Sequence, residues 1–309
     1  IHQDRESFQN YLEWYRQNQV GNLMAFRPAY RWSGSAACDP EVWTMLQKYL
    51  NDLEMDYTLI LDGRELPGKN ANPPPGMLSG PHFHGRQSHE NDGSFCYWGN
   101  QLWKKEPLPE PYADLLARGI DKGGIQPHVR PKRTDQGAWW FFDPHKAHDL
   151  KEAAEDFIHN LADARGDSTR HSGPSVLFRY FFQAGYEYLL AEQMYGPEEF
   201  VLAALRGASS AYQAKGFGTH NATQWSSTPH DTPEHAERYF LSLATAYING
   251  AGDINVEEGL WRMEKGYVDY DRYSRNCLRH LEAHTRFRKY LETHTRRGRM
   301  CLPFAILQG

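Results

Sequence analysis

Short strand-like segments alternate with amphipathic helical segments along this chain, and the alternation predicts an α/β fold with a parallel sheet. Eight strand candidates can be counted, which is the number that closes a (β/α)8 barrel. A length of 309 residues suits this architecture, because such barrels take roughly 250 residues plus insertions. The sequence therefore predicts one (β/α)8 TIM-barrel domain over residues 1–309.

Each expected strand is a short strand-like run. No helical segment separates the fourth candidate from the fifth, which is the one break in the alternation. The candidates are residues 22–26, 57–61, 138–142, 176–182, 188–192, 217–223, 253–257 and 302–307.

The expected helices carry end signals as well as helical apolar spacing. In the segment 39–54, Asp39 is a plausible N-cap and Pro40 falls in the first turn. The same pattern returns over residues 147–164, 196–216 and 231–250, and the last two end on Lys-Gly and Asn-Gly.

Residues 63–137 interrupt this regularity. They are rich in Pro, Gly, His and Asn, and include NPPPG and PHFHGRQSHENDGSFCYWGN. The segment is too long for an ordinary connector. It predicts a long loop insertion, after an early strand, that lines the mouth of the barrel.

Composition argues against several classes of protein. The chain has 34 basic and 39 acidic residues, a formal charge of −5, so it lacks the basic footprint of a nucleic-acid-binding protein. Its four cysteines show no metal or redox spacing. No apolar run approaches the roughly 20 residues of a membrane span, and no signal-peptide core opens the chain.

The chain opens with Ile rather than Met and stops within CLPFAILQG. We therefore expect a mature protein or a fragment of a longer one. It is expected to be soluble, and a secreted or periplasmic location would require a signal segment outside this chain.

The segment 252–261, GDINVEEGLW, is the most informative stretch. Alternation along a strand puts Asp253, Asn255 and Glu257 on one face and the more apolar residues on the other. If the apolar face packs on helices, Glu257 points into the barrel at a strand tip, where catalytic groups of such barrels lie. The neighbouring Glu258 is the alternative, and both glutamates would also suit a solvated helix start.

A second carboxylate, Glu192, ends an apolar run in YEYLLAEQM, just before a Tyr-Gly-Pro turn. With GYEYLLAEQM and GDINVEEGLW, the chain resembles the (β/α)8 glycoside hydrolases that use two glutamates. The resemblance implies retaining hydrolysis of an oligo- or polysaccharide, with Glu257 as the nucleophile and Glu192 as the general acid/base. Such chemistry needs neither a cofactor nor a metal.

Polar and aromatic side chains near the predicted strand tips, and others within the inserted segment, form the expected carbohydrate-binding set, because rings stack on sugar faces and polar groups bind hydroxyls. The expected contacts are Asp62, Arg64, Glu65, Arg86, Glu90, Asp92, Trp98, Arg179, His220, Gln224, Trp225, Asn255, Glu258 and Trp261.

Two other classes stay open. His82 and His84 form an HxH pair that, with His220 and His230, would suit a metal-dependent hydrolase of the amidohydrolase type. A noncatalytic carbohydrate-binding barrel would keep the aromatic residues without the paired acids. No GxSxG, Walker or GxGxxG motif occurs, which argues against serine hydrolases of that type and nucleotide-dependent enzymes.

Overall fold

A computed structural model gives the arrangement of most of the chain. The part that it describes comprises residues 13, 15–26, 40–52, 54–60, 73–90, 149–174, 176–194, 197–223, 232–256, 270–298 and 301.

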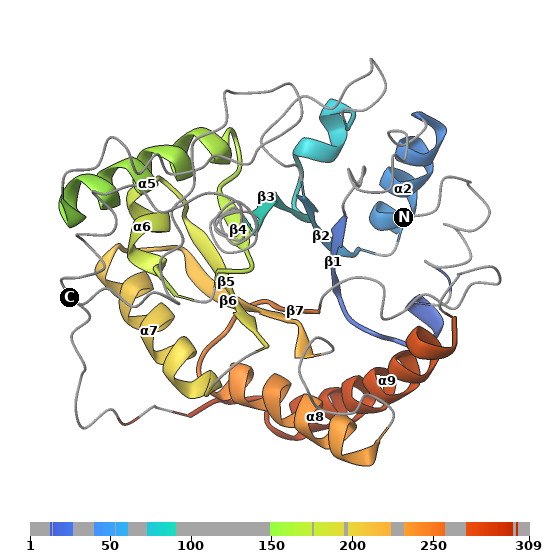
Figure 1. The fold of residues 1–309 in the computed structure, drawn as a ribbon. Helices are drawn as coiled ribbons and strands as arrows, with labels where there is room; N and C mark the ends of the chain where they lie inside the picture. Colours follow the sequence, from blue (N-terminus) through green and yellow to red (C-terminus); the bar gives the residue numbers. More distant parts are fainter. Residues whose placement is uncertain are drawn as a thin grey trace.

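Seven parallel strands form one sheet that curves into a nearly closed barrel, in the order β1 to β7 (Figure 1). The α/β class is therefore confirmed, while an eighth strand is not seen in the described residues. The strands are β1 (Leu23–Phe26), β2 (Asp56–Ile60), β3 (Phe83–His89), β4 (Arg170–Ser172), β5 (Tyr188–Gln193), β6 (Gly216–Asn221) and β7 (Ile254–Val256).

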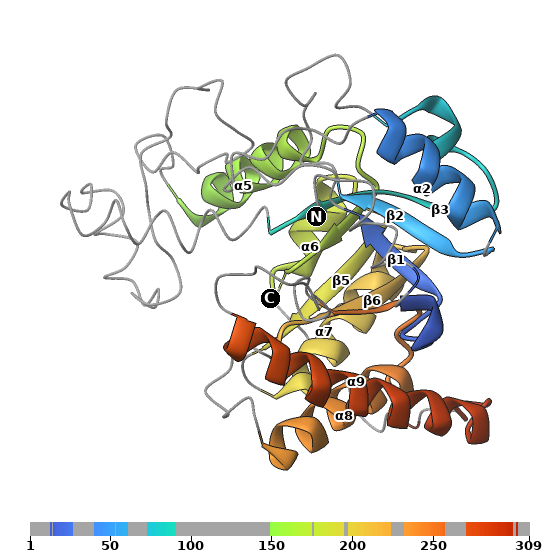
Figure 2. The same ribbon diagram turned by 90° about the vertical axis from the view of Figure 1, so that its right-hand side faces the viewer.

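Helices lie around the outside of the strands, and α8 and α9 run side by side (Figures 1 and 2). The described helices are α2 (Pro40–Asp52), α5 (Leu150–Arg165), α6 (Phe178–Gln183), α7 (Glu198–Ala211), α8 (Pro233–Ile248) and α9 (Tyr270–Thr293), with a short 3-10 helix η2 (Pro75–Leu78).

Local signals explain where two of these helices begin. The Asp149 side chain accepts a hydrogen bond from the backbone N of Glu152 (2.8 Å) and caps α5. Thr232 does the same for the backbone N of His235 (3.2 Å), and Pro233 follows at the first helical position of α8. Each cap stabilises its helix by about 1 kcal/mol, and both helices were predicted from the sequence.

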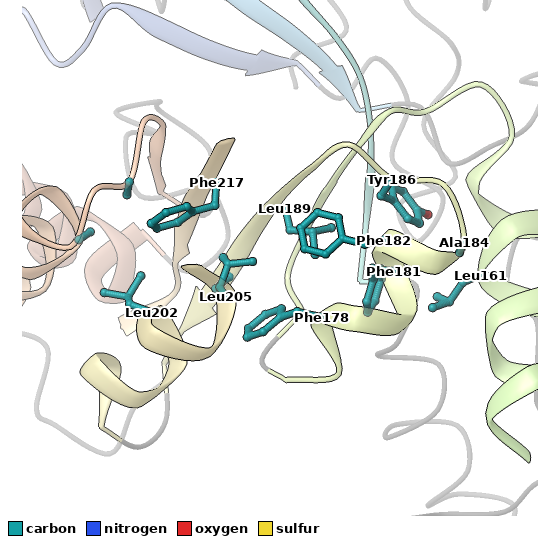
Figure 3. Packing of buried hydrophobic residues seen from close by; sticks show 13 residues of the cluster. Leu161, Phe178, Phe181, Phe182, Ala184, Tyr186, Leu189, Leu202, Leu205 and Phe217 are labelled. Atoms are coloured by element: carbon teal, nitrogen blue, oxygen red, sulfur yellow. The ribbon is translucent and has the colours of Figure 1, made fainter. Parts of the chain in front are cut away.

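The largest apolar cluster lies between the strands and helices α6 and α7 (Figure 3). Leu189 and Ala191 of β5 are fully buried there, against Phe181 of α6 and Leu205 of α7. Burying a Leu or Phe side chain contributes about 1.5–3 kcal/mol. Because Leu189 and Ala191 face the helices, the alternate residues of β5 face the barrel interior.

The predicted strand 176–182 is wrong, since residues 178–183 form helix α6. Its aromatic run reads as strand by composition, but Phe178, Phe181 and Phe182 are the buried residues, at helical spacing. The alternation of strand and helix therefore continues through this region, which removes the irregularity noted in the sequence.

The predicted insertion needs correction as well. Residues 83–89, within the segment 63–137, form strand β3 of the barrel rather than a loop, and β4 was not predicted. Both strands are polar, FHGRQSH and RHS, so neither shows the apolar pattern that marks a strand. The predicted strands 138–142 and 302–307 lie outside the described residues, as do 91–137 of the expected insertion.

Within the part of the chain that the structure describes, none of the helices combines the length and apolar character needed to cross a bilayer.

Candidate functional site

All seven strands are parallel, so their carboxyl ends meet at one end of the barrel, here called the mouth. His220, near the end of β6, is paired in register with Glu192 of β5 on one side and Asn255 of β7 on the other. Directly paired residues share a face of a sheet. The mouth therefore carries a row of three polar side chains from three neighbouring strands.

The packing of β7 shows which face points inward. Ile254 and Val256 pack against the apolar cluster formed by α8 and α9. Asp253 and Asn255 consequently face the barrel interior. The Nδ2 atom of Asn255 is buried and, among the described residues, has no hydrogen-bond partner, so a donor is aimed at the interior without an acceptor.

A polar layer closes the barrel beneath the mouth. Arg170 of β4 forms an ion pair with Asp253, and its guanidinium carbon lies 4.0 Å from the ring centre of Tyr188. The Tyr188 hydroxyl donates to the carbonyl of Phe217 (2.8 Å) and accepts from the backbone N of Asp253 (3.0 Å). Burial raises the pKa of Tyr188, so this hydroxyl stays neutral. Its two hydrogen bonds link β5 to the backbone of β6 and of the residue before β7.

Beside Glu192, the mouth holds a second group of ionisable side chains. His89 and Glu90, at the end of β3, lie next to His220, with one ligand atom from each residue within 4.8 Å of the others. The His89 and His220 rings meet edge to face, with centres 4.9 Å apart. Two imidazoles and a carboxylate are donors that can hold a transition-metal ion.

Hydrogen bonds on the outer side hold the ends of β5 and β6. The buried amide of Asn221 donates to Ser242 Oγ of α8 (2.6 Å), and Ser242 donates to Gln193 Oε1 (3.2 Å). Burial raises the pKa of Glu198, although its contact with the Ser242 hydroxyl opposes the shift. The network joins α7 and α8 to the residues that follow Glu192 and His220 in the chain.

Two predicted contact residues do not lie at the mouth. Arg86 forms an ion pair with Asp167 (3.0 Å), which precedes β4 and so lies at the opposite end of the barrel. Arg179 is on helix α6 rather than on a strand, and its Nη2 donates to the hydroxyl of Tyr180 (2.9 Å). Both predictions assumed secondary structure that these residues do not have.

The HxH pair is also far from the mouth. His82 Nδ1 and His84 Nε2 lie 3.1 and 3.3 Å from Asp56 Oδ1, at the amino ends of β2 and β3. His220 is at the carboxyl end of β6, so these histidines cannot share one metal with it. His230 lies outside the described residues.

The structure therefore brings Glu90, Glu192, His220 and Asn255 to one end of the barrel. The other predicted residues lie outside the described residues. These are Glu257, Asp62, Arg64, Glu65, Asp92, Trp98, Gln224, Trp225, Glu258 and Trp261.

Two further residues of the mouth were not identified from the sequence. They are His89 and Ser172, which belong to the polar strands β3 and β4 that lack apolar alternation. A signal was nevertheless present, because Gln87 and His89 are two residues apart and so share a strand face.

A scan against protein-family models finds no match for this chain, and a search of curated proteins finds no matching relative. The resemblance to glycoside hydrolases therefore stays a prediction that depends on the residues themselves.

Proposed function

We propose that this chain is a glycoside hydrolase that cleaves an oligo- or polysaccharide with retention of anomeric configuration. The observation that carries the proposal is the position of Glu192, half-buried near the carboxyl end of β5 on the inner face, in register with His220. A carboxyl group there lies at the end of the barrel where catalytic groups of such barrels lie, which is the position that a general acid needs.

Glu257 is the proposed nucleophile. It lies outside the described residues. The inward faces of Asp253 and Asn255 support the choice, because they agree with the alternation from which Glu257 was predicted. Retention requires the two carboxyl groups to be about 5 Å apart.

The remaining polar groups of the mouth suit a sugar ligand. Asn255 Nδ2 is a buried donor that a sugar hydroxyl can satisfy. His220 lies on the neighbouring strand end, in register with both Glu192 and Asn255.

The proposal is tested with Glu192→Gln and Glu257→Gln, assayed on aryl glycosides with and without azide. Loss of a general acid lowers turnover by about 10²–10⁴-fold, and least for the best leaving groups, which need no protonation. The Glu257 variant is expected to lose turnover for every leaving group. Azide is expected to restore turnover to the Glu192 variant, because the covalent intermediate still forms and a small anion can attack it.

A matched control is Glu187→Gln. Glu187 directly precedes β5, at the opposite end of the barrel from the mouth, where it pairs with Lys215 and is 43% exposed. Its variant is expected to keep wild-type turnover. If Glu192→Gln and Glu257→Gln both keep full turnover, the proposal is wrong. If the wild type binds oligosaccharides and cleaves none, the chain is a binding barrel instead.

A further inference from the structure

We propose that His89, Glu90 and His220 form a transition-metal site at the mouth, which goes beyond the proposed glycosidase chemistry. One ligand atom from each of the three residues lies within 4.8 Å of the other two. Two histidines and one carboxylate form the three-ligand set found in some catalytic zinc sites. Imidazole donors select zinc and neighbouring transition metals over calcium and magnesium, which prefer oxygen ligands.

The spacing of the donors fits such an ion. Bonds of about 2.0–2.1 Å to a tetrahedral metal place two donors about 3.3–3.4 Å apart. His89 Nε2 and Glu90 Oε1 are separated by 3.3 Å. Two imidazole rings on one tetrahedral metal have centres about 5 Å apart, and the rings of His89 and His220 are 4.9 Å apart. The third donor, from His220, lies within 4.8 Å of the other two.

A hydrogen bond orients the His89 ring, as is usual for a histidine that binds a metal. Its Nδ1 atom forms a hydrogen bond with Ser172 Oγ (2.9 Å), which leaves Nε2 facing Glu90. Ser172 is fully buried and also contacts Gln87 Nε2 (2.9 Å). A second ring nitrogen fixed by a buried partner orients the imidazole and raises its affinity for a metal.

The hydrogen bonds that link Gln87, Ser172 and His89 can exchange donor and acceptor roles. With Gln87 donating to Ser172, and Ser172 donating to His89 Nδ1, the Nε2–H group donates to Glu90. If the Gln87 amide turns over, Ser172 donates to its oxygen and His89 Nδ1–H donates to Ser172. Nε2 then carries a lone pair directed at a metal. Reaching this tautomer takes one proton off Nε2 and places one on Nδ1, so the neutral imidazole keeps a single proton.

The backbone fixes Glu90 in an unusual conformation. Its φ angle is +48°, in the left-handed region, and its N–H donates to the carbonyl of Ser172 (2.9 Å). A Cβ atom on Gly173 would lie 2.8 Å from Glu90 Cγ, so a glycine at position 173 is needed to leave room for the Glu90 side chain. Strained positions that neighbouring structure enforces are concentrated at functional sites. The three protein ligands leave a fourth position for water or a substrate oxygen.

The test is a titration of the chelator-treated, desalted full chain with Co²⁺, followed by its visible absorption, and with Zn²⁺ by calorimetry. We expect one equivalent to bind, with the intense spectrum of a tetrahedral site. His89→Gln and Glu90→Gln should each weaken binding by about 100-fold, and Ser172→Ala by about 10- to 100-fold. These readouts need no turnover, so they are independent of the proposed hydrolysis.

The matched control is His84→Gln. His84 lies on the same strand as His89, but at the amino end beside Asp56, and its loss should leave the affinity unchanged. Far-UV circular dichroism establishes that each variant is folded. Binding of less than one equivalent by the wild type, or equal affinity in folded His89→Gln and Glu90→Gln proteins, would overturn the proposal. The proposal would also be overturned if His84→Gln lost as much metal affinity as His89→Gln and Glu90→Gln.

Discussion

The ion pair between Arg170 and Asp253 should be essential for the stability of the barrel interior. The two side chains are 6% and 18% exposed, so both charges have lost most of their water. Replacing Arg170 by Met leaves the Asp253 carboxylate buried without its counter-ion, and it removes the cation that lies 4.0 Å from the Tyr188 ring centre. Breaking a buried pair in this way costs about 3–5 kcal/mol.

The double variant separates the pair from the individual side chains. Arg170→Met together with Asp253→Leu removes both charges, and well-packed apolar replacements of buried ion pairs are often neutral or stabilising by about 1–4 kcal/mol. We therefore expect each single variant to be less stable than the double variant. A coupling energy of at least about 3 kcal/mol should follow.

Urea unfolding measures these free energies. Tryptophan fluorescence and far-UV circular dichroism should give the same transition midpoint, which establishes that unfolding is two-state. Single variants within about 0.5 kcal/mol of the wild type, the range of ordinary surface substitutions, would refute the reasoning. Strictly additive effects would refute it as well, because they would mean that the two charges do not stabilise each other.

Four further variants test other parts of the structure, each by urea unfolding. Gly173→Ala should lower the free energy of unfolding by at least about 1 kcal/mol, because φ is +101° at this position and the new Cβ would crowd Glu90. Gly207→Ala on α7 places its Cβ in open space and should stabilise the protein by about 0.5–1 kcal/mol. Burial lowers the pKa of His284 to about 4, so between pH 6.5 and 4 the unfolded chain takes up a proton at this residue and the folded chain does not. The free energy of unfolding should therefore fall by up to about 3 kcal/mol as the pH drops through that range. The fall should be smaller in His284→Gln, which lacks the titrating group. Asn221→Leu should cost about 1–3 kcal/mol, since it leaves the groups that bond its amide unpaired.

Where apolar spacing marks an element, the sequence alone was sufficient to predict it. Helices α5 and α8 have a capping side chain followed by apolar residues at helical spacing, and strand β5 is an apolar run between turns. These signals are local, because they depend on a residue and its neighbours within one or two turns. The placement of Glu192 at the end of β5 followed directly from them.

Strands β3 and β4 could not be found in this way. Their inner faces point into a polar barrel interior, and Ser88 and His171 on their outer faces bond each other (2.8 Å) instead of packing as apolar side chains. A strand of this kind is stabilised by its neighbours in the sheet, and nothing within the segment itself marks it. The prediction of a loop for FHGRQSH failed for that reason.

The sequence by itself determined the α/β class, most of the helices and the carboxylate at the end of β5. Only the tertiary structure decided that His89 and Glu90 meet His220, and that the HxH pair lies at the opposite end of the barrel. The physical reason is that hydrophobic periodicity specifies which face of an element is buried, whereas the register between parallel strands specifies which distant side chains become neighbours. That register is formed by the whole sheet and has no local signature.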